Sequence, residues 1–275
     1  MKNVFRISLI LLGVLLIWVG VKFFSLSNLK PENTSFPDSY NKAKIVLTEM
    51  GEAHGIQFWD SIQTYNVIYE DEFYGFLGKQ SHPFQEQKVK FSLNYIPKIF
   101  NGQLEILTGK DKGIIWGIQS GQTYKKNDSN EIVVQDDKDM KFWIPTYQYF
   151  VEFPSRIQEA TALEYLGRNI INGIEVEGVL ASWGSLKPQK DIDQYIIWID
   201  INSKRIVKVA YTVREMYGFV SGAAYFQNYK NYNGLLLPSL LPVESNLLTK
   251  GYLHKMGILD FKTNYMDKDS LLPLD

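Results

Sequence analysis

The chain has 275 residues, of which 45% are hydrophobic and 14% aromatic, so it can bury a large core. Its 29 basic and 30 acidic side chains give a net charge of -1, which excludes the strongly basic surface typical of nucleic-acid-binding proteins. The absence of cysteine excludes disulfides, thiolate metal sites, cysteine nucleophiles and lipid attachment through a cysteine.

The N-terminal residues have the pattern of an export signal. Lys2 and Arg6 precede an uncharged run at residues 7–21. As a helix this run would measure ~22 Å, which is shorter than the ~30 Å hydrocarbon core of a bilayer. Extending the helix to Leu26 reaches the required length but includes Lys22, a side chain that could reach the interface from the end of a span.

Two interpretations of this segment place the rest of the chain outside the cytoplasm. Residues 1–27 are predicted to be a signal-anchor that enters the membrane through residues 7–26. The alternative is a cleaved signal peptide, with Ser25 and Ser27 as the small residues near the cut, which would give a secreted protein. In both cases the basic N-terminus stays inside and the main domain lies in the periplasm or at the cell surface. The remaining alternative is a buried helix of a cytosolic protein.

A linker and a helix follow. Residues 28–39 are polar and contain two prolines, which is typical of a linker, and residues 40–275 are predicted to form one domain. Helical spacing at residues 40–53 places these apolar residues near one face: Ala43, Ile45, Val46, Met50 and Ala53. Gly55 just after the run predicts a left-handed helix stop, and His54 suits the last turn of the helix.

From Thr64 the apolar period changes to two, which predicts strands. The first strand places these residues on one face: Tyr65, Val67, Tyr69, Asp71 and Phe73. The next alternates Val89, Phe91, Leu93 and Tyr95 against polar residues. Residues 139–160 interrupt this pattern with crowded aromatic side chains and two prolines, so one or two short helices are expected there.

Strands resume after this insertion. Three Asn-containing turns, at residues 172–173, 202–203 and 233–234, separate successive strands, and Asn-Gly is a strong hairpin signal. About ten strands joined mostly by tight turns should pair antiparallel. Strand residues 194–200 and 206–214 are apolar on both faces, so the sheet needs a covering on each side, from helices, a bound apolar ligand, a partner or the membrane.

The chain offers little for catalysis. It has three histidines, and nothing in the spacing brings His82 or His254 to His54. Glu52 and His54 would point about 200° apart on a helix, which argues against an acid–base pair. The P-loop, G-x-S-x-G and H-E-x-x-H patterns are absent from the sequence. We therefore predict no enzymatic activity, no catalytic residue, no metal ligand and no cofactor.

Three groups of residues resemble a known family. They are Ala53, His54, Gly55 and Trp59; Tyr195, Asp200, Val209 and Tyr211; and Tyr229, Gly234 and Pro238. Over residues 40–263 the chain resembles exported bacterial proteins related to the lipoprotein carriers, the LolA-like proteins. The resemblance implies an α+β fold, with a curved antiparallel sheet that forms an unclosed barrel and helices packed on its concave side. In the named carriers that cavity takes acyl chains.

The resemblance and the apolar strands together predict a function. The chain is expected to be an exported, membrane-tethered cell-envelope protein that binds a lipid, acyl chain or other apolar ligand. A concave pocket of at least a few hundred Å³, the size of ordinary ligand sites, is expected. Its expected lining is Val67, Tyr69, Phe91, Leu93, Tyr195, Ile197, Val209 and Tyr211. The alternatives are a structural or interaction protein with a filled interior and a hydrolase with a dispersed site.

Overall fold

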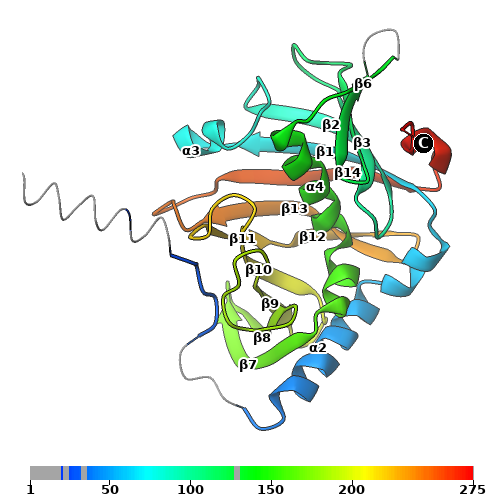
Figure 1. Ribbon diagram of the computed structural model, residues 1–275. Coiled ribbons are helices and arrows are strands. Elements are labelled where there is room, and N and C mark those ends of the chain that lie inside the picture. The colour runs from blue at the N-terminus through cyan, green and yellow to red at the C-terminus, as the bar shows by residue number, and fades with distance from the viewer. Residues whose placement is uncertain (1–19, 21–24, 32–35, 127–130, 275) are drawn as a thin grey trace, which may run out of the picture.

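A single antiparallel sheet organises the computed structural model, which describes residues 20, 25–31, 36–126 and 131–274. The strands pair in the order β6-β5-β4-β3-β2-β1-β14-β13-β11-β10-β9-β8-β7, and β12 pairs with β13 (Figure 1). Their bounds are β1 Tyr65–Phe73, β2 Lys88–Ile96, β3 Asn101–Ile106, β4 Ile115–Gln119, β5 Gln122–Lys126, β6 Ile132–Val134, β7 Ala162–Ile171, β8 Ile174–Ser182, β9 Tyr195–Asp200, β10 Ile206–Thr212, β11 Ser221–Tyr225, β12 Gln227–Tyr232, β13 Leu235–Ser245 and β14 His254–Thr263.

The helices are few and lie mainly on one side of this sheet. Their bounds are α2 Ser39–Ala53, α3 Gly75–Gln80 and α4 Lys138–Arg156, with short 3-10 helices η1 Ile56–Ser61, η2 Ile157–Glu159 and η3 Lys268–Leu271. Figure 1 shows α4 crossing the face around which the sheet curves, with α2 beside it. The predicted α+β fold with an unclosed, curved antiparallel sheet is confirmed, with fourteen strands among the described residues in place of about ten.

Helix α2 ends where its sequence predicts. His54 is its C-terminal cap and Gly55 follows with φ 72°, in the left-handed region. The buried stripe is Ala43, Val46, Leu47, Met50 and Gly51. The expectation that Ile45 lies on this stripe is wrong, because Ile45 is 58% exposed. At 100° per residue it points about 200° away from Ala43, and Leu47 takes its place.

Helix α4 is longer than expected. The prolines at 145 and 154 lie inside one helix rather than dividing it. An internal proline removes a backbone hydrogen bond and costs ~3 kcal/mol, so packing must offset this loss. The buried residues that supply the packing include Trp143, Ile144, Tyr147, Phe150, Val151 and Phe153. Asp137 caps the N-terminus, where its side chain accepts a hydrogen bond from the Met140 amide at 2.9 Å.

The convex face of β7–β10 has a smaller core of its own. Leu166, Leu180 and Ile196 form it, and Leu29 and Leu186 pack against it. The two faces of β9 are therefore covered separately, as its apolar residues on both faces require. Ile196 packs into this smaller core, whereas its neighbour Ile197 packs into the main core. Leu29 belongs to the segment that was expected to be a linker.

None of the helices in the described ranges has the length and apolar content needed to cross a membrane. Apart from residues 20, 25 and 26, the predicted membrane segment at residues 7–26 lies outside the described residues.

Candidate functional site

The eight residues expected to line a pocket form four cross-strand pairs. Val67 pairs with Leu93 and Tyr69 with Phe91 on β1 and β2. Ile197 pairs with Val209 and Tyr195 with Tyr211 on β9 and β10. All eight belong to one hydrophobic core beneath α4. The structure thus brings them together on one face of the sheet as two patches, the β1–β2 patch and the β9–β10 patch.

Helix α4 contacts both patches through aromatic rings. The Tyr147 ring lies 5.2 Å from that of Tyr69 and 5.5 Å from that of Phe91, measured between centroids. On the other patch, Tyr149 stacks on Tyr195 at 5.8 Å. Aromatic pairs at these distances contribute ~0.5–1.5 kcal/mol each beyond the area they bury.

Exposure distinguishes the two patches. The four residues of the β1–β2 patch are 0% exposed. On the β9–β10 patch Ile197 and Val209 are also 0% exposed, whereas Tyr195 and Tyr211 are partly exposed. Of the two patches, only the β9–β10 patch is therefore reached by solvent, at Tyr195 and Tyr211.

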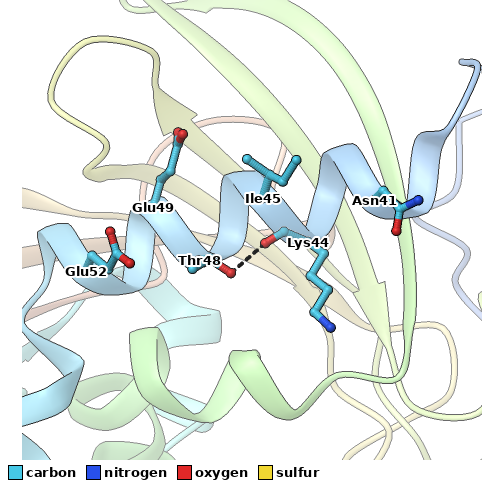
Figure 2. Close-up of a pocket in the computed structure, with 6 residues that line it drawn as sticks. All are labelled: Asn41, Lys44, Ile45, Thr48, Glu49 and Glu52. Atoms are coloured by element: carbon cyan, nitrogen blue, oxygen red, sulfur yellow. Dashed lines mark hydrogen bonds between the residues drawn. The ribbon is translucent and has the colours of Figure 1, made fainter.

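Protein side chains occupy the space beneath α4 where an open pocket was expected. A hollow of about 450 Å³ lies instead on the outer side of α2. Its lining comes from that helix alone: Asn41, Lys44, Ile45, Thr48, Glu49 and Glu52 (Figure 2). A second hollow, between the start of β2 and residues 106–111, measures about 10 Å³, which is the space of roughly one water. The expectation of a preformed concave pocket is wrong for this conformation, because α4 fills the space with rings.

A buried carboxylate lies between α4 and the β1–β2 side. Asp71 is 0% exposed, and its Oδ2 accepts a hydrogen bond from the Tyr147 hydroxyl at 3.0 Å. His254 Nδ1 lies 3.0 and 2.9 Å from the two carboxylate oxygens and donates to them. A carboxylate without partners at such a site would cost several kcal/mol. Burial, followed by the nearby Asp71 charge, raises the pKa of the Tyr147 hydroxyl, which therefore keeps its proton.

A second buried carboxylate belongs to α4 itself. Glu152 is 2% exposed and accepts hydrogen bonds from the Tyr65 hydroxyl at 2.7 Å and the Lys98 amide at 3.0 Å. Its ion pair with Arg156 measures 2.9 Å. The Tyr95 hydroxyl also donates to the Ile144 carbonyl of α4 at 2.8 Å. Polar contacts therefore fix α4 along the β1–β2 side.

The three histidines occupy two separate places. His54 is 2% exposed; its Nδ1 donates to the Met50 carbonyl at 2.7 Å, and its Nε2 lies 3.1 Å from the Tyr229 hydroxyl. Burial lowers the pKa of His54 to about 4, against the weaker raising effect of the Met50 bond. The ring is therefore neutral near pH 7, and it acts at the helix end through hydrogen bonds rather than through a positive charge that interacts with the helix dipole.

His82 and His254 both stack on Phe73, with centroid distances of 3.8 and 5.2 Å. Across the described residues, no group of three or more His, Cys, Asp or Glu side chains is placed to hold a metal ion.

The cluster of Asp71, Tyr147 and His254 was not predicted from the sequence, although Asp71 itself gives an indication of it. Asp71 is the one charged residue on the alternating face formed by Tyr65, Val67, Tyr69 and Phe73. A charge on a face that is otherwise apolar requires a buried partner. Its partners come from α4 and β14, and no local spacing could identify them.

Comparisons with known proteins show the fold. No protein-family model and no curated protein matches the sequence. A domain assigned to outer membrane lipoprotein sorting from Vibrio parahaemolyticus is similar in structure, with a TM-score of 0.57 and 13% identity over 85% of this chain and 97% of that one. A DUF1329 family protein from Desulfovibrio piger has a TM-score of 0.54 and 8% identity, over 84% of this chain and 95% of that one.

A LolA superfamily protein from Nitrosomonas europaea is also similar, with a TM-score of 0.50 and 11% identity over 83% of this chain and 96% of that one. The chain therefore has the LolA-like fold, as its sequence resemblance implies.

Proposed function

We propose that the protein binds a lipid, an acyl chain or another apolar molecule between α4 and the sheet. Its main domain lies outside the cytoplasm, and residues 7–26 tether it to a membrane. The observation that carries this proposal is the partly exposed Tyr195–Tyr211 pair on the concave face. It gives an apolar ligand a route from solvent to Ile197 and Val209, which lie fully buried behind it. The LolA-like fold supports the same function.

The contacts of α4 indicate which side could open. Toward the β1–β2 patch, hydrogen bonds from Tyr65, Tyr95 and Tyr147 fix the helix. Toward the β9–β10 patch, ring contacts predominate, such as Phe150 with Tyr211 at 5.5 Å. Ring contacts are replaceable by acyl methylene groups, each of which contributes ~0.8 kcal/mol when buried. A guest would therefore displace α4 from the β9–β10 patch and leave the polar contacts in place.

Uptake of a fluorescent fatty acid by the full chain tests the proposal. Val209→Trp places a large ring in the β9–β10 patch and should abolish uptake. Val67→Trp is the matched control, because Val67 is an equally buried valine on the same face but in the β1–β2 patch. Both changes overpack the core and cost ~1–3 kcal/mol, so thermal unfolding must confirm that each variant is folded. We expect uptake by the wild type and by Val67→Trp, and no uptake by Val209→Trp. The membrane segment is present in all three proteins, so a difference in uptake cannot come from that segment.

One observation favours a second function. The concave face is filled by α4, which suits a cell-envelope structural or interaction protein with no ligand. Equal fatty-acid uptake by wild type and Val209→Trp would support this function and overturn ligand binding at the patch.

We propose no enzymatic activity for this protein. In the described chain the hydrogen bonds of the histidines lead to Met50, Tyr229, Phe84 and Asp71. None of these contacts joins a histidine to a serine or threonine, so no activated hydroxyl nucleophile is present among them.

A further inference from the structure

The segment before α2 is bound to one end of the sheet. The Ser27 amide donates to the Gly218 carbonyl at 2.8 Å. Arg214, which is 9% exposed, donates to the Ser27 hydroxyl at 3.0 Å and to the Ser27 carbonyl at 2.6 Å. A guanidinium that binds one residue at two points holds it in a defined position. The chain is therefore fixed where it reaches the loop between β10 and β11.

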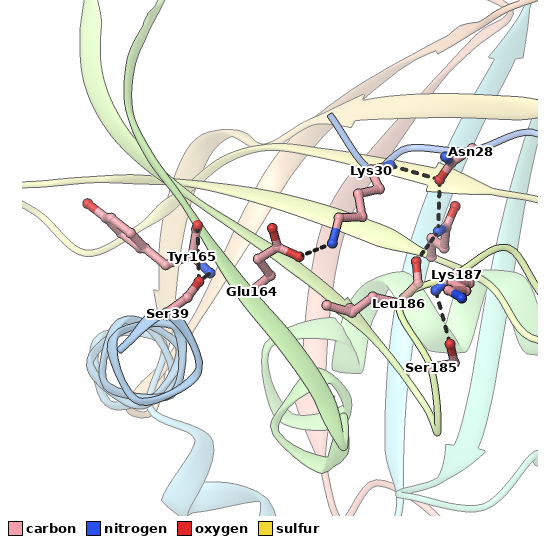
Figure 3. A network of polar contacts seen from close by, with 9 residues as sticks. Asn28, Lys30, Ser39, Glu164, Tyr165, Ser185, Leu186 and Lys187 are labelled. Atoms are coloured by element: carbon pink, nitrogen blue, oxygen red, sulfur yellow. Dashed lines mark hydrogen bonds and ion pairs between the residues drawn. The ribbon is translucent and has the colours of Figure 1, made fainter. Parts of the chain in front are cut away.

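The next three residues extend this attachment. Gln194 donates to the Asn28 side chain at 3.2 Å and accepts from the Leu29 amide at 3.0 Å. Lys30 forms an ion pair of 2.6 Å with Glu164 (Figure 3). Residues 27–30 thus run from this end of the sheet across the starts of β9 and β7.

The loops at this end form a continuous surface, which we call the loop rim. It consists of residues 213–220, residues 246–253 and helix α3. The Asn246 side chain donates to the Phe219 carbonyl at 2.8 Å, and the Tyr74 amide donates to the Leu253 carbonyl at 2.9 Å. These two bonds join the three segments in a row.

The loop rim exposes large apolar side chains. Phe76 is 77% exposed, Tyr217 53%, Leu247 48% and Met216 40%. Lys79 and Lys250 are also exposed on the loop rim, and Glu215 is its one acidic residue. Aromatic and aliphatic side chains accompanied by lysines are typical of surfaces that contact an anionic bilayer.

We propose that the loop rim lies against the bilayer that residues 7–26 enter. The proposal rests on the membrane tether of the proposed function. Ser27 follows this segment directly, and even from residue 21, where the uncharged run ends, only five residues intervene, a distance of at most ~20 Å when fully extended. The opposite end of the sheet also exposes apolar residues, such as Ile170, which is 65% exposed. However, the nine residues of β8 place that end ~30 Å farther away.

Fluorescence quenching in vesicles tests this contact directly. Because the chain has no cysteine, Tyr217→Cys and Ile170→Cys each provide a single labelling site. The full-length variants are labelled with an environment-sensitive fluorophore and reconstituted in phosphatidylcholine–phosphatidylglycerol vesicles, with and without lipids carrying a nitroxide near the headgroup. We expect blue-shifted emission and quenching by the nitroxide lipid at position 217, and aqueous, unquenched emission at position 170.

Three results would overturn this contact. If the label at 217 is as unquenched as the label at 170 in protein that floats with the vesicles, the loop rim does not touch the bilayer. Equal quenching at both positions would mean that the protein lies on the membrane without this orientation. Protein that does not float overturns the tether and the rim contact together. Fatty-acid uptake is measured in a separate experiment. Failure of the membrane contact therefore does not decide whether the protein binds an apolar ligand.

Discussion

The Tyr147 hydroxyl of α4 donates to the carboxylate of Asp71 on β1 at 3.0 Å, and both groups are fully buried. This bond connects the helix that fills the concave face to a strand near the middle of the sheet order. Removing the donor leaves a buried carboxylate with one fewer partner, and His254 remains as its other donor. The loss of this bond should therefore lower the stability of the fold, whereas opening of α4 from the β9–β10 patch does not require the bond to break.

Tyr147→Phe should lower the free energy of unfolding by ~1–3 kcal/mol, because Asp71 loses a hydrogen bond while the ring packing is kept. Because a guest is proposed to leave the contacts toward the β1–β2 patch in place, the same variant should take up a fluorescent fatty acid at the wild-type rate. Urea unfolding measures the first effect and stopped-flow fluorescence the second.

Tyr69→Phe is the matched control for this variant. Tyr69 is 0% exposed and its ring packs on that of Tyr147, but its hydroxyl has no hydrogen-bond partner in the described structure. Removing that hydroxyl should be neutral or stabilising. Equal destabilisation by the two variants would show that the Tyr147–Asp71 bond contributes nothing beyond the shared ring packing.

Glu152→Gln should be more damaging than a surface change. The substitution removes the negative charge that faces Arg156. The two carboxylate oxygens accept hydrogen bonds from Tyr65 and Lys98, and the glutamine amide has only one oxygen to accept them. Breaking a buried pair from one side costs ~3–5 kcal/mol, which thermal unfolding would detect. Lys141 and Asp136 form an exposed pair at the start of the same helix, and Asp136→Asn should leave the stability close to that of the wild type, because solvent screens an exposed pair. Similar losses from the two substitutions would contradict the role given to Glu152.

His54 should make the protein less stable as the solution becomes acidic. Its pKa is about 4 in the fold against 6.5 for an ordinary histidine, so in this interval the unfolded chain binds the proton more tightly. Stability should therefore fall as the pH drops from 6.5 toward 4, by roughly 3 kcal/mol from this group.

Denaturant unfolding across this pH range, for wild type and His54→Asn, measures the contribution of the imidazole. The pH dependence should become shallower in the variant. Tyr229→Phe is the control and should keep the wild-type pH dependence. Burial lowers the pKa of His54, and this variant keeps the imidazole buried. A pH dependence that is unchanged in His54→Asn would assign the acid sensitivity to other groups.

Local periodicity predicted the parts of this fold that depend on neighbouring residues. Alternation along β1, β2, β9 and β10 identified residues that share the concave face, because side chains alternate in direction along any strand. It could not show that α4 fills that face, since Pro145 and Pro154 predict interruptions and only tertiary packing offsets them. It also could not place Leu29 on the convex core, because one apolar residue in a polar stretch has no period.

Gly55→Val should be among the most destabilising single substitutions at the C-terminal end of α2. Gly55 has φ 72°, a conformation that costs a β-branched residue ~1–2 kcal/mol. A Cβ there would also lie 2.0 Å from the Gly234 carbonyl oxygen, which belongs to the turn between β12 and β13. The turn must move, and the Leu236 amide, which donates to the His54 carbonyl at 3.1 Å, would lose that bond.

Gly113→Ala separates the two costs. Gly113 has φ 91°, so alanine is strained there as well, but nothing lies within 4 Å of its Cβ. Gly55→Ala and Gly113→Ala therefore share the backbone cost and differ in the steric clash. We expect a loss of ~1 kcal/mol for Gly113→Ala and at least twice that for Gly55→Ala, measured as free energies of unfolding. Equal losses would show that the turn at Gly234 yields freely and that the junction of α2 with β12 and β13 is not tightly packed.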